Sequence, residues 1–377
     1  MLDSIPMTRR NFVRASTVLA GTILVGGTVG RSGPVPAWAQ TSAPPTVDRL
    51  AVRVVVDSYQ DALVRTAKVG TVEVQRFGVV FGPGLGKHIH NEFGLSLHLE
   101  SQRGGETRHA LLDFGFTPTA LFNNLDLLKI DTASVDALIV SHGHFDHFGG
   151  LVPLLRRDRA KMQRDLPLYV GGENTFCYRW AVPPGGQPQS FDVLDRRDLT
   201  ATNVRVVLAD KPAVIAGHGF TTGAIARTSF EKVLPNTQVE VSMRDGAGCD
   251  PSHFTQEERE GKLVFDNHWG EHATCFNVKD RGLVVISSCG HAGLINSIRQ
   301  AQAVSGVQKV HAVIGGFHLS PAPEPYIAQT VQALKELDVD YIIPMHCSGA
   351  GFIRAVQRDL QDRFIMSYTG TRYIFGA

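Results

Sequence analysis

The chain is poor in cysteine, and its cysteines form no recognisable pattern. There are five in 377 residues, none has C-x-x-C spacing, and an odd number cannot all pair within one chain. We therefore expect no disulfide framework. Internal repeats and low-complexity segments are also missing, so the length suits one large globular domain or two smaller ones.

An excess of charge of one sign is missing as well. The formal net charge is +1, but residues 1–40 hold four arginines and one aspartate. Taking these from the totals of 37 basic and 36 acidic residues leaves a net charge of −2. This balance gives no support to a nucleic-acid-binding surface, so we expect no nucleic acid partner.

No apolar run near the N-terminus is long enough to favour a membrane anchor. Arg9-Arg10-Asn11-Phe12 precedes a glycine-interrupted apolar stretch, and Ala37-Trp38-Ala39 supplies the small residues of a signal peptidase site. The paired arginines resemble a twin-arginine export signal. We expect a signal peptide over 1–39, a disordered leader over 40–49 and export by the twin-arginine machinery. The mature protein would then be periplasmic or secreted, with no stable membrane anchor after cleavage.

Histidine is abundant at one place. His142-Gly143-His144-Phe145-Asp146-His147 follows the apolar run 135–140, whose length and β-branched residues indicate a buried strand. Imidazole and carboxylate groups are costly to bury unless they are paired or bind a metal. A solvated, histidine-rich turn is the alternative, but a ligand-rich loop after a strand favours a metal site.

The rest of the chain alternates between expected strands and helices. Residues 51–56, 94–99 and 109–115 read as strands, and 117–128 and 151–165 read as helices. Residues 181–260 are less regular and are interpreted as strands with an irregular insertion that lies over the site. We expect a single domain over 50–377.

Three later strands are each followed by a histidine. Strands are expected over 282–287, 311–315 and 340–344, with helices over 294–304 and 325–336 between them. His291, His318 and His346 follow the three strands in turn. In α/β folds this carboxyl end of the strands is where chemistry is usually placed.

The His142–His147 run resembles the H-x-H-x-D-H signature of the metallo-β-lactamase superfamily, and the strand ending at Asp113 resembles its first motif. A narrower resemblance is to the dihydropterin-ribofuranosyl-aminobenzene-phosphate synthase-like branch. It is carried by Thr221-Thr222-Gly223, Cys289-Gly290-His291-Ala292-Gly293, Gly316-Phe317-His318-Leu319 and His346-Cys347-Ser348-Gly349. The resemblance implies an α/β fold, the αββα sandwich of two mixed β-sheets flanked by helices.

The resemblance also implies a site for two metal ions, which we expect to be Zn²⁺, with Mn²⁺ or iron as alternatives. His142 and His144 would hold the first ion, and Asp146, His147 and His346 the second. Many members bridge their metals with an aspartate from a later strand, but here that strand is followed by Ser288-Cys289-Gly290-His291. His291 would therefore have to complete the site. A helix-start role for His291 and a supporting role for His346 are the alternatives.

Other residues have weaker signals. Asp146 is expected to orient the nucleophile, and His318 to donate a proton to the leaving group or bind substrate, unless it is only a packed loop residue. Arg227 is a candidate binder of a substrate carboxylate or phosphate, with a surface salt bridge as the alternative. Cys289 and Cys347 are expected to be packing residues, with a metal-thiolate role as the alternative for both. Most histidines of the irregular middle are expected to be surface or structural residues, and the alternative for any of them is a place at the mouth of the site: His218, His253, His268 and His272.

These features predict an exported hydrolase that uses a metal-bound hydroxide on an ester, lactone, amide or phosphoester bond of a small molecule. An iron-dependent oxidoreductase is the alternative from another reaction class, and a non-catalytic metal-binding protein is the third. Because fold does not fix function, the superfamily name does not make the chain a lactamase.

Overall fold

A computed structural model describes residues 44–183, 185–235, 237–259 and 262–376. The chain divides into two units, 1–33 and 34–377, and all the described residues belong to the second. The predicted signal peptide and residues 40–43 of the predicted leader lie outside the described residues. No helix in the described ranges is long and apolar enough to cross a membrane.

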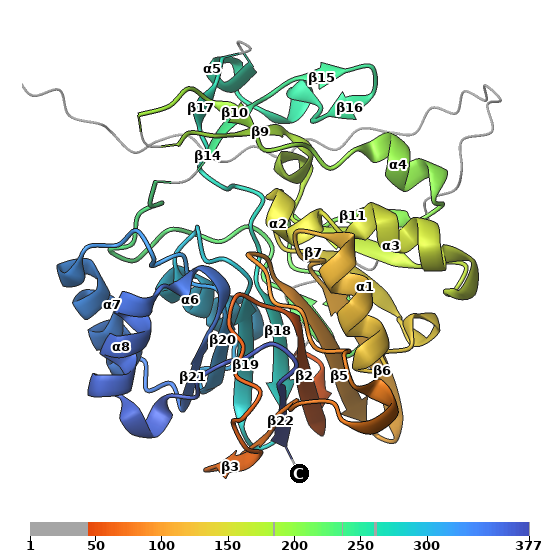
Figure 1. The fold of residues 1–377 in the computed structure, drawn as a ribbon. Helices are drawn as coiled ribbons and strands as arrows, with labels where there is room; N and C mark the ends of the chain where they lie inside the picture. The colour runs from red at the N-terminus through yellow and green to blue at the C-terminus, as the bar shows by residue number, and fades with distance from the viewer. Residues whose placement is uncertain (1–43, 184, 236, 260–261, 377) are drawn as a thin grey trace, which may run out of the picture. The chain divides into compact units, whose positions relative to one another are not determined.

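Two mixed β-sheets form the centre of the described structure (Figure 1). The nine-stranded sheet has the order β11-β8-β7-β6-β5-β2-β22-β4-β3, and the seven-stranded sheet the order β12-β13-β18-β19-β20-β21, with β1 beside β18. The strands of the first sheet are β2 (Arg49–Val56), β3 (Ala67–Val69), β4 (Val72–Gln75), β5 (Ser96–Arg103), β6 (Glu106–Leu112), β7 (Ala137–Val140), β8 (Pro167–Val170), β11 (Arg205–Leu208) and β22 (Arg372–Gly376). Those of the second are β1 (Thr46–Val47), β12 (Val214–Ile215), β13 (Gly219–Thr221), β18 (Thr274–Val278), β19 (Gly282–Ser287), β20 (Val310–Gly315) and β21 (Tyr341–Pro344).

Helices cover the outer faces of the two sheets: α1 (Pro118–Leu127) and α3 (Leu151–Asp158) on the first, and α6 (Leu294–Ser305), α7 (Glu324–Glu336) and α8 (Ala350–Asp359) on the second. The remaining helices of the described residues are short: α2 (Phe145–Phe148), α4 (Arg196–Ala201) and α5 (Gln256–Arg259). One buried cluster joins α1 and α3 to the nine-stranded sheet, and another joins α6, α7 and α8 to the seven-stranded sheet. Thr117 caps α1 by accepting a hydrogen bond from the Ala120 N–H, as expected at a helix N-terminus.

The core between the sheets follows from the alternation of side chains along each strand. In β19, Val284 and Ile286 belong to the cluster between the sheets, whereas Val285 belongs to the cluster beneath the helices. Both faces of this strand are therefore buried, which is why its sequence is an unbroken apolar run. The predicted αββα sandwich with two mixed sheets is confirmed.

The predicted leader is wrong at its C-terminal end. Thr46–Val47 forms β1, which pairs in parallel with β18, and Arg49 already belongs to β2. Val47 is fully buried in the core between the sheets. The polar composition of this segment suggests disorder. It is ordered because the Val47 side chain is buried and the β1 backbone pairs with β18.

The irregular stretch predicted over 181–260 contributes to a small sheet of its own. Its strands are β9 (Tyr178–Ala181), β10 (Gln189–Ser190), β14 (Thr237–Glu240) and β17 (Val264–Phe265), with a β-hairpin of β15 (Met243–Arg244) and β16 (Ala247–Gly248). Figure 1 shows this small sheet beyond one end of the two large sheets. We call residues 177–204 and 237–268, which contain these strands, the cap.

A disulfide between Cys177 and Cys249 ties the cap together, so the expectation of no disulfide framework is wrong for this pair. They lie 72 residues apart, and no local spacing reveals such a pair. Another expectation is wrong in part, because the helix predicted over 151–165 ends at Asp158 and continues as a short 3₁₀ turn.

Candidate metal centre

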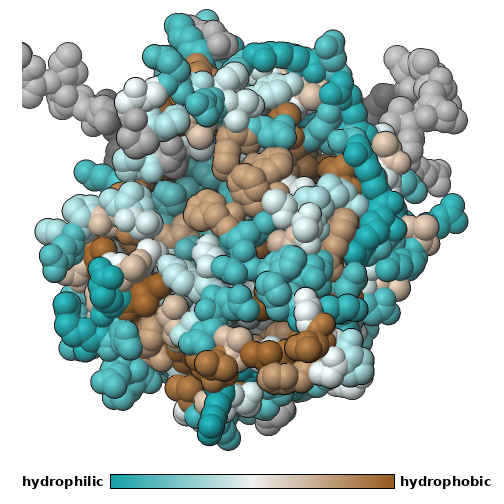
Figure 2. Space-filling model, in the orientation of Figure 1, coloured by the Kyte–Doolittle hydropathy of each residue, from teal (hydrophilic) through white to brown (hydrophobic). Residues whose placement is uncertain are grey.

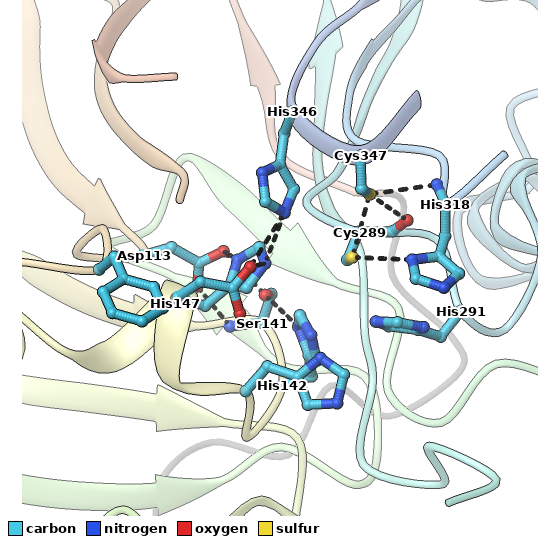
Figure 3. A network of polar contacts seen from close by, with 12 residues as sticks. Asp113, Ser141, His142, His147, Cys289, His291, His318, His346 and Cys347 are labelled. Carbon is cyan, nitrogen blue, oxygen red and sulfur yellow. Dashed lines mark hydrogen bonds and ion pairs between the residues drawn. The ribbon is translucent and has the colours of Figure 1, made fainter. Parts of the chain in front are cut away.

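The candidate site lies where loops from both large sheets meet. The loop after β7 carries the residues from His142 to His147, and the loops after β19, β20 and β21 carry His291, His318 and His346. Since β19, β20 and β21 run parallel, their carboxyl ends share one edge of the sheet. Figure 3 shows the histidines from these loops pointing toward one another.

The first ligand group consists of His142, His144 and His291. One ring nitrogen from each lies within 4.8 Å of the others, and all three residues are buried. Ser141 Oγ lies 2.9 Å from His142 Nδ1, and Thr237 Oγ1 lies 2.8 Å from His144 Nε2. These contacts orient the rings, and His142 Nε2 is left buried with no hydrogen-bond partner among the described residues.

The second ligand group consists of Asp146, His147 and His346, whose ligand atoms also lie within 4.8 Å of one another. The two Nε2 atoms of His147 and His346 face each other at 3.2 Å, and Asp146 Oδ2 lies 3.3 Å from His346 Nε2. Asp146 Oδ1 is buried without a hydrogen-bond partner in the described ranges. Two imidazole nitrogens and a carboxylate that converge in this way fit a divalent cation.

The electrostatics of both groups suit metal binding. Burial holds the pKa values of His142, His144 and His291 well below the ordinary histidine value, and neighbouring histidines lower them further. Burial raises the pKa of the Asp146 carboxyl, but His147 and His346 outweigh it and leave the pKa lowered. Neutral imidazole and ionised carboxylate are the forms that ligate metals.

Asp113 supports the loop from behind. It follows β6 with a φ of 58°, and its carboxylate accepts hydrogen bonds of 2.8 Å from the backbone N–H and from the hydroxyl of Ser141. Asp113 Oδ2 also lies 2.8 Å from His147 Nδ1, which turns the other ring nitrogen toward His346 (Figure 3). A carboxylate behind a ligating histidine is a common way to fix its ring.

Gly143 is needed between the first two histidines. A Cβ at this position would collide with the Arg179 guanidinium and the carbonyl oxygen of Thr175. Arg179 is fully buried and donates to Asp266 Oδ2 at 2.8 Å, so it cannot move aside without breaking a buried ion pair. The loop backbone and the cap are therefore in direct contact.

Several functional neighbours were missed by sequence reasoning. His268 is buried, and its ring stacks on His291 with centroids 3.8 Å apart, while His144, Asp266 and His268 form another cluster of ligand-type atoms. The expectation that the histidines of this region lie mostly at the surface or in structural roles fits His253, which is exposed, but not His268. His218 and His272 are buried against Ser101 and the Val140 carbonyl. No motif spacing could have found His268, because the fold of the cap brings it to the site.

His318 lies at the border of the site, with its ring centroid 4.1 Å from that of His291. Its Nδ1 lies 3.7 Å from Cys289 Sγ, and its backbone N–H donates to Cys347 Sγ at 3.2 Å. Burial lowers the pKa of His318, but the neighbouring Cys347 outweighs it and raises the pKa. A partly buried histidine with a raised pKa beside the ligand groups is suited to act as an acid.

Arg227 lies near the site without belonging to either ligand group. Its guanidinium donates to the carbonyl of Asn267 and lies over the Trp269 ring, 4.8 Å from the centroid. Burial lowers its pKa, although Glu271 opposes this. The surface salt bridge considered for Arg227 is not its contact here. The side chain instead flanks the segment that carries His268.

Apolar side chains border the ligand groups. Phe93 is 59% exposed, and its ring centroid lies 4.9 Å from that of His346, while the ring of Phe191 lies 5.6 Å from that of His144. Phe116 and Phe145 make an edge-to-face contact at 5.1 Å. Figure 2 shows apolar side chains gathered on this face in the region of α2 and the cap. We call Phe93, Phe116, Phe145 and Phe191 the aromatic rim.

Comparisons with known proteins agree with this geometry. Residues 102–226, which include the His142–His147 loop, match the family model of the metallo-beta-lactamase superfamily. The chain is 28% identical over 291 residues to the 7,8-dihydropterin-6-methyl-4-(beta-D-ribofuranosyl)-aminobenzene-5'-phosphate synthase of Methanocaldococcus jannaschii, covering 76% of this chain and 91% of that protein. An uncharacterized protein of the same organism is 24% identical over 242 residues, covering 64% of this chain and 80% of the relative.

A solved structure has the same fold. The crystal structure of Tm1679, described as a metal-dependent hydrolase of the beta-lactamase superfamily, superposes with a TM-score of 0.61 at 18% identity. The match covers 86% of this chain and 98% of that one. The resemblance inferred from the motifs is confirmed by the matched segment, the relatives and the αββα sandwich. Residues 102–226 of the chain therefore match the metallo-beta-lactamase superfamily model, and the chain shares its fold with the solved structure.

Proposed function

We propose that the protein is an exported, metal-dependent hydrolase that acts on a small molecule. The observation that carries this proposal is the apposition of two buried ligand groups, one of three histidines and one of two histidines and an aspartate. His142 and His147 link the groups, because their ring centroids lie only 4.3 Å apart. This spacing suits two metal ions at one reaction centre.

The metals would be held by His142, His144 and His291 and by Asp146, His147 and His346. When bound, zinc or a similar ion supplies Lewis acidity and lowers the pKa of a water molecule to about 7, so that a nucleophile is available at neutral pH. The chain's own residues then have distinct roles. Asp146 Oδ1 is a buried acceptor without a partner in the described structure, and it can take a proton at this point.

The remaining residues would bind and release the substrate. The aromatic rim covers one side of the ligand groups with apolar surface, which favours a substrate that has an apolar part next to the bond attacked. His318 would give its proton to the leaving group, since its pKa is raised and its ring packs beside His291. Arg227, which lies beyond His268, would attract an anionic group on the substrate.

Export is supported by two independent features. The N-terminal sequence resembles a twin-arginine signal, and the cap contains a disulfide. Disulfides persist in oxidising compartments such as the periplasm and are rare in reducing ones. Fractionation of a producing cell, with and without Arg9→Lys and Arg10→Lys, tests the proposal. Full-length protein retained in the cytoplasm in both cases would contradict it.

The hydrolase proposal is tested by metal content and a substrate panel. Purified mature protein should contain about two metal ions per chain and hydrolyse some of a panel of esters, lactones, phosphodiesters and amides. A chelator should remove the activity, and added zinc should restore it. His144→Ala should lose the activity, whereas the exposed His253→Ala should keep it. An iron protein with redox activity and no hydrolysis would favour the oxidoreductase instead.

A second candidate is a bond-forming reaction of the kind that the relative's name implies. The alignment with the Methanocaldococcus jannaschii synthase spans 91% of that protein, which favours a related active-site layout. The two candidates are distinguished by a substrate pair: a dihydropterin whose 6-methyl carbon carries a leaving group such as diphosphate, which departs as the new bond forms, and a ribofuranosyl-aminobenzene phosphate compound. Product formation from this pair, with no hydrolysis of the panel, would replace the hydrolase proposal.

A further inference from the structure

Cys289 lies at the junction of the two ligand groups. It is buried, with 3% of its surface exposed, and it follows β19 two positions before His291. Its Sγ and one ring nitrogen each from His142 and His147 lie within 4.8 Å of one another. Because His142 belongs to the first group and His147 to the second, the sulfur faces both.

A neighbouring atom also points to a ligand at this place. The Nε2 atom of His142 is buried and has no hydrogen-bond partner among the described residues. Burying such an atom is costly unless something binds it. A cation between His142 and Cys289 would give the nitrogen and the sulfur a common partner.

The second thiol, Cys347, is engaged elsewhere. Its Sγ accepts from the backbone N–H of His318 at 3.2 Å and lies 3.3 Å from the carbonyl oxygen of Cys289. The two sulfurs lie 3.1 Å apart, with Cys289 on the side of His142 and His147 (Figure 3). The contacts of Cys347 therefore suit a residue that holds Cys289 in place. Cys289 itself lies where its sulfur can bind a metal.

We propose that Cys289 is a metal ligand and that its sulfur takes the place between the two groups where many relatives have an aspartate. This inference rests on the proposed metal-dependent function. A coordinating thiol loses its proton, which leaves to solvent as the metal binds. A thiolate at this place would also bias the site toward zinc or iron and away from magnesium or manganese, which prefer oxygen ligands.

X-ray absorption on the zinc-loaded mature protein tests the proposal directly. A shell of sulfur at about 2.3 Å should accompany nitrogen and oxygen at about 2.0–2.1 Å. The cobalt-substituted protein should show a sulfur-to-cobalt charge-transfer band in the near ultraviolet. Both signals should be lost in Cys289→Ser and remain in Cys347→Ser and in Cys275→Ser, which alters a buried thiol of β18.

Cys289→Asp is the matched control for folding, because it supplies a carboxylate at the same place. This variant should bind the same number of metal ions as the parent but show no sulfur shell. Metal-loaded parent protein without a sulfur shell, or a shell that persists in Cys289→Ser, would overturn the ligand proposal and leave the hydrolase proposal standing. Failure of the parent to bind any metal would overturn both.

Discussion

The two large sheets contribute to the site in very different ways. The nine-stranded sheet supplies four potential ligands from one loop of six residues, His142 to His147, after β7. The seven-stranded sheet supplies His291 and His346 from separate loops that are more than fifty residues apart. In the second ligand group, His147 from one sheet faces His346 from the other at 3.2 Å. The comparison teaches that each ligand group depends on how the sheets pack, although most of the candidate ligands lie on one loop.

The strongest test of this comparison removes one partner from each sheet. His147→Ala and His346→Ala should each lower kcat/KM by about 10³-fold or more, since a catalytic metal contributes several kcal/mol of transition-state stabilisation. Metal content should fall by about one ion per chain in both. If the two variants differ in metal content, the second ligand group does not act as one unit. His253→Ala, which alters an exposed histidine, is the control.

The cap depends on a covalent link that neither large sheet has. Cys177→Ser or Cys249→Ser opens a loop of 72 residues and should lower the free energy of unfolding by about 2–4 kcal/mol. Urea unfolding under non-reducing conditions measures this change. Reductant should destabilise the parent by a similar amount and leave the variants unchanged. A reductant effect that is equal in parent and variants would show that the disulfide does not stabilise the cap.

Replacing Asp113 tests whether the nine-stranded sheet positions the candidate ligands that it carries. Asp113→Ala removes the acceptor behind His147 and Ser141, so metal affinity should fall by about 10–100-fold. Competition with a chromogenic chelator measures this affinity. Asp136→Ala is the matched control, because it also removes an aspartate whose carboxylate accepts a backbone N–H, that of His109, but away from the ligand groups. Equal losses in both variants would argue against a specific role for Asp113.

The smallest expected effect is the pH dependence of stability caused by His98, a histidine of the nine-stranded sheet that belongs to neither ligand group. Burial, with a contribution from His109, lowers the pKa of His98 to about 3. The His98 side chain therefore binds a proton near pH 6.5 in the unfolded chain, but only near pH 3 in the folded state. Because of this difference, stability is lost as the pH falls from about 6.5 toward 3. Between pH 6.5 and 5.5, His98→Gln should lose less stability than the parent, by under about 1.4 kcal/mol. Denaturant unfolding at the two pH values measures the free energy of unfolding of both proteins. An equal change in this free energy between the two pH values in parent and variant would contradict the lowered pKa.

Sequence reasoning recovered the large elements, and the structure brings the predicted ligand residues together in two groups. The apolar runs of β7, β19 and β20 are readable because both faces of each strand are buried. The leader was misjudged because Val47 is a single buried residue in a polar segment. The disulfide of the cap and the place of His268 were missed because both depend on residues far apart along the chain.

The sequence by itself determined the fold class and the dense loop of histidines and aspartate, because strand periodicity and the spacing from His142 to His147 are local properties. The packing of the two sheets decided which histidines share a ligand group and placed the sulfur of Cys289 near His142 and His147. Tertiary structure also brought Thr237 and His268 of the cap to His144. Hydrogen bonds and ligand geometry act over a few ångströms, and only the folded chain brings such distant residues that close.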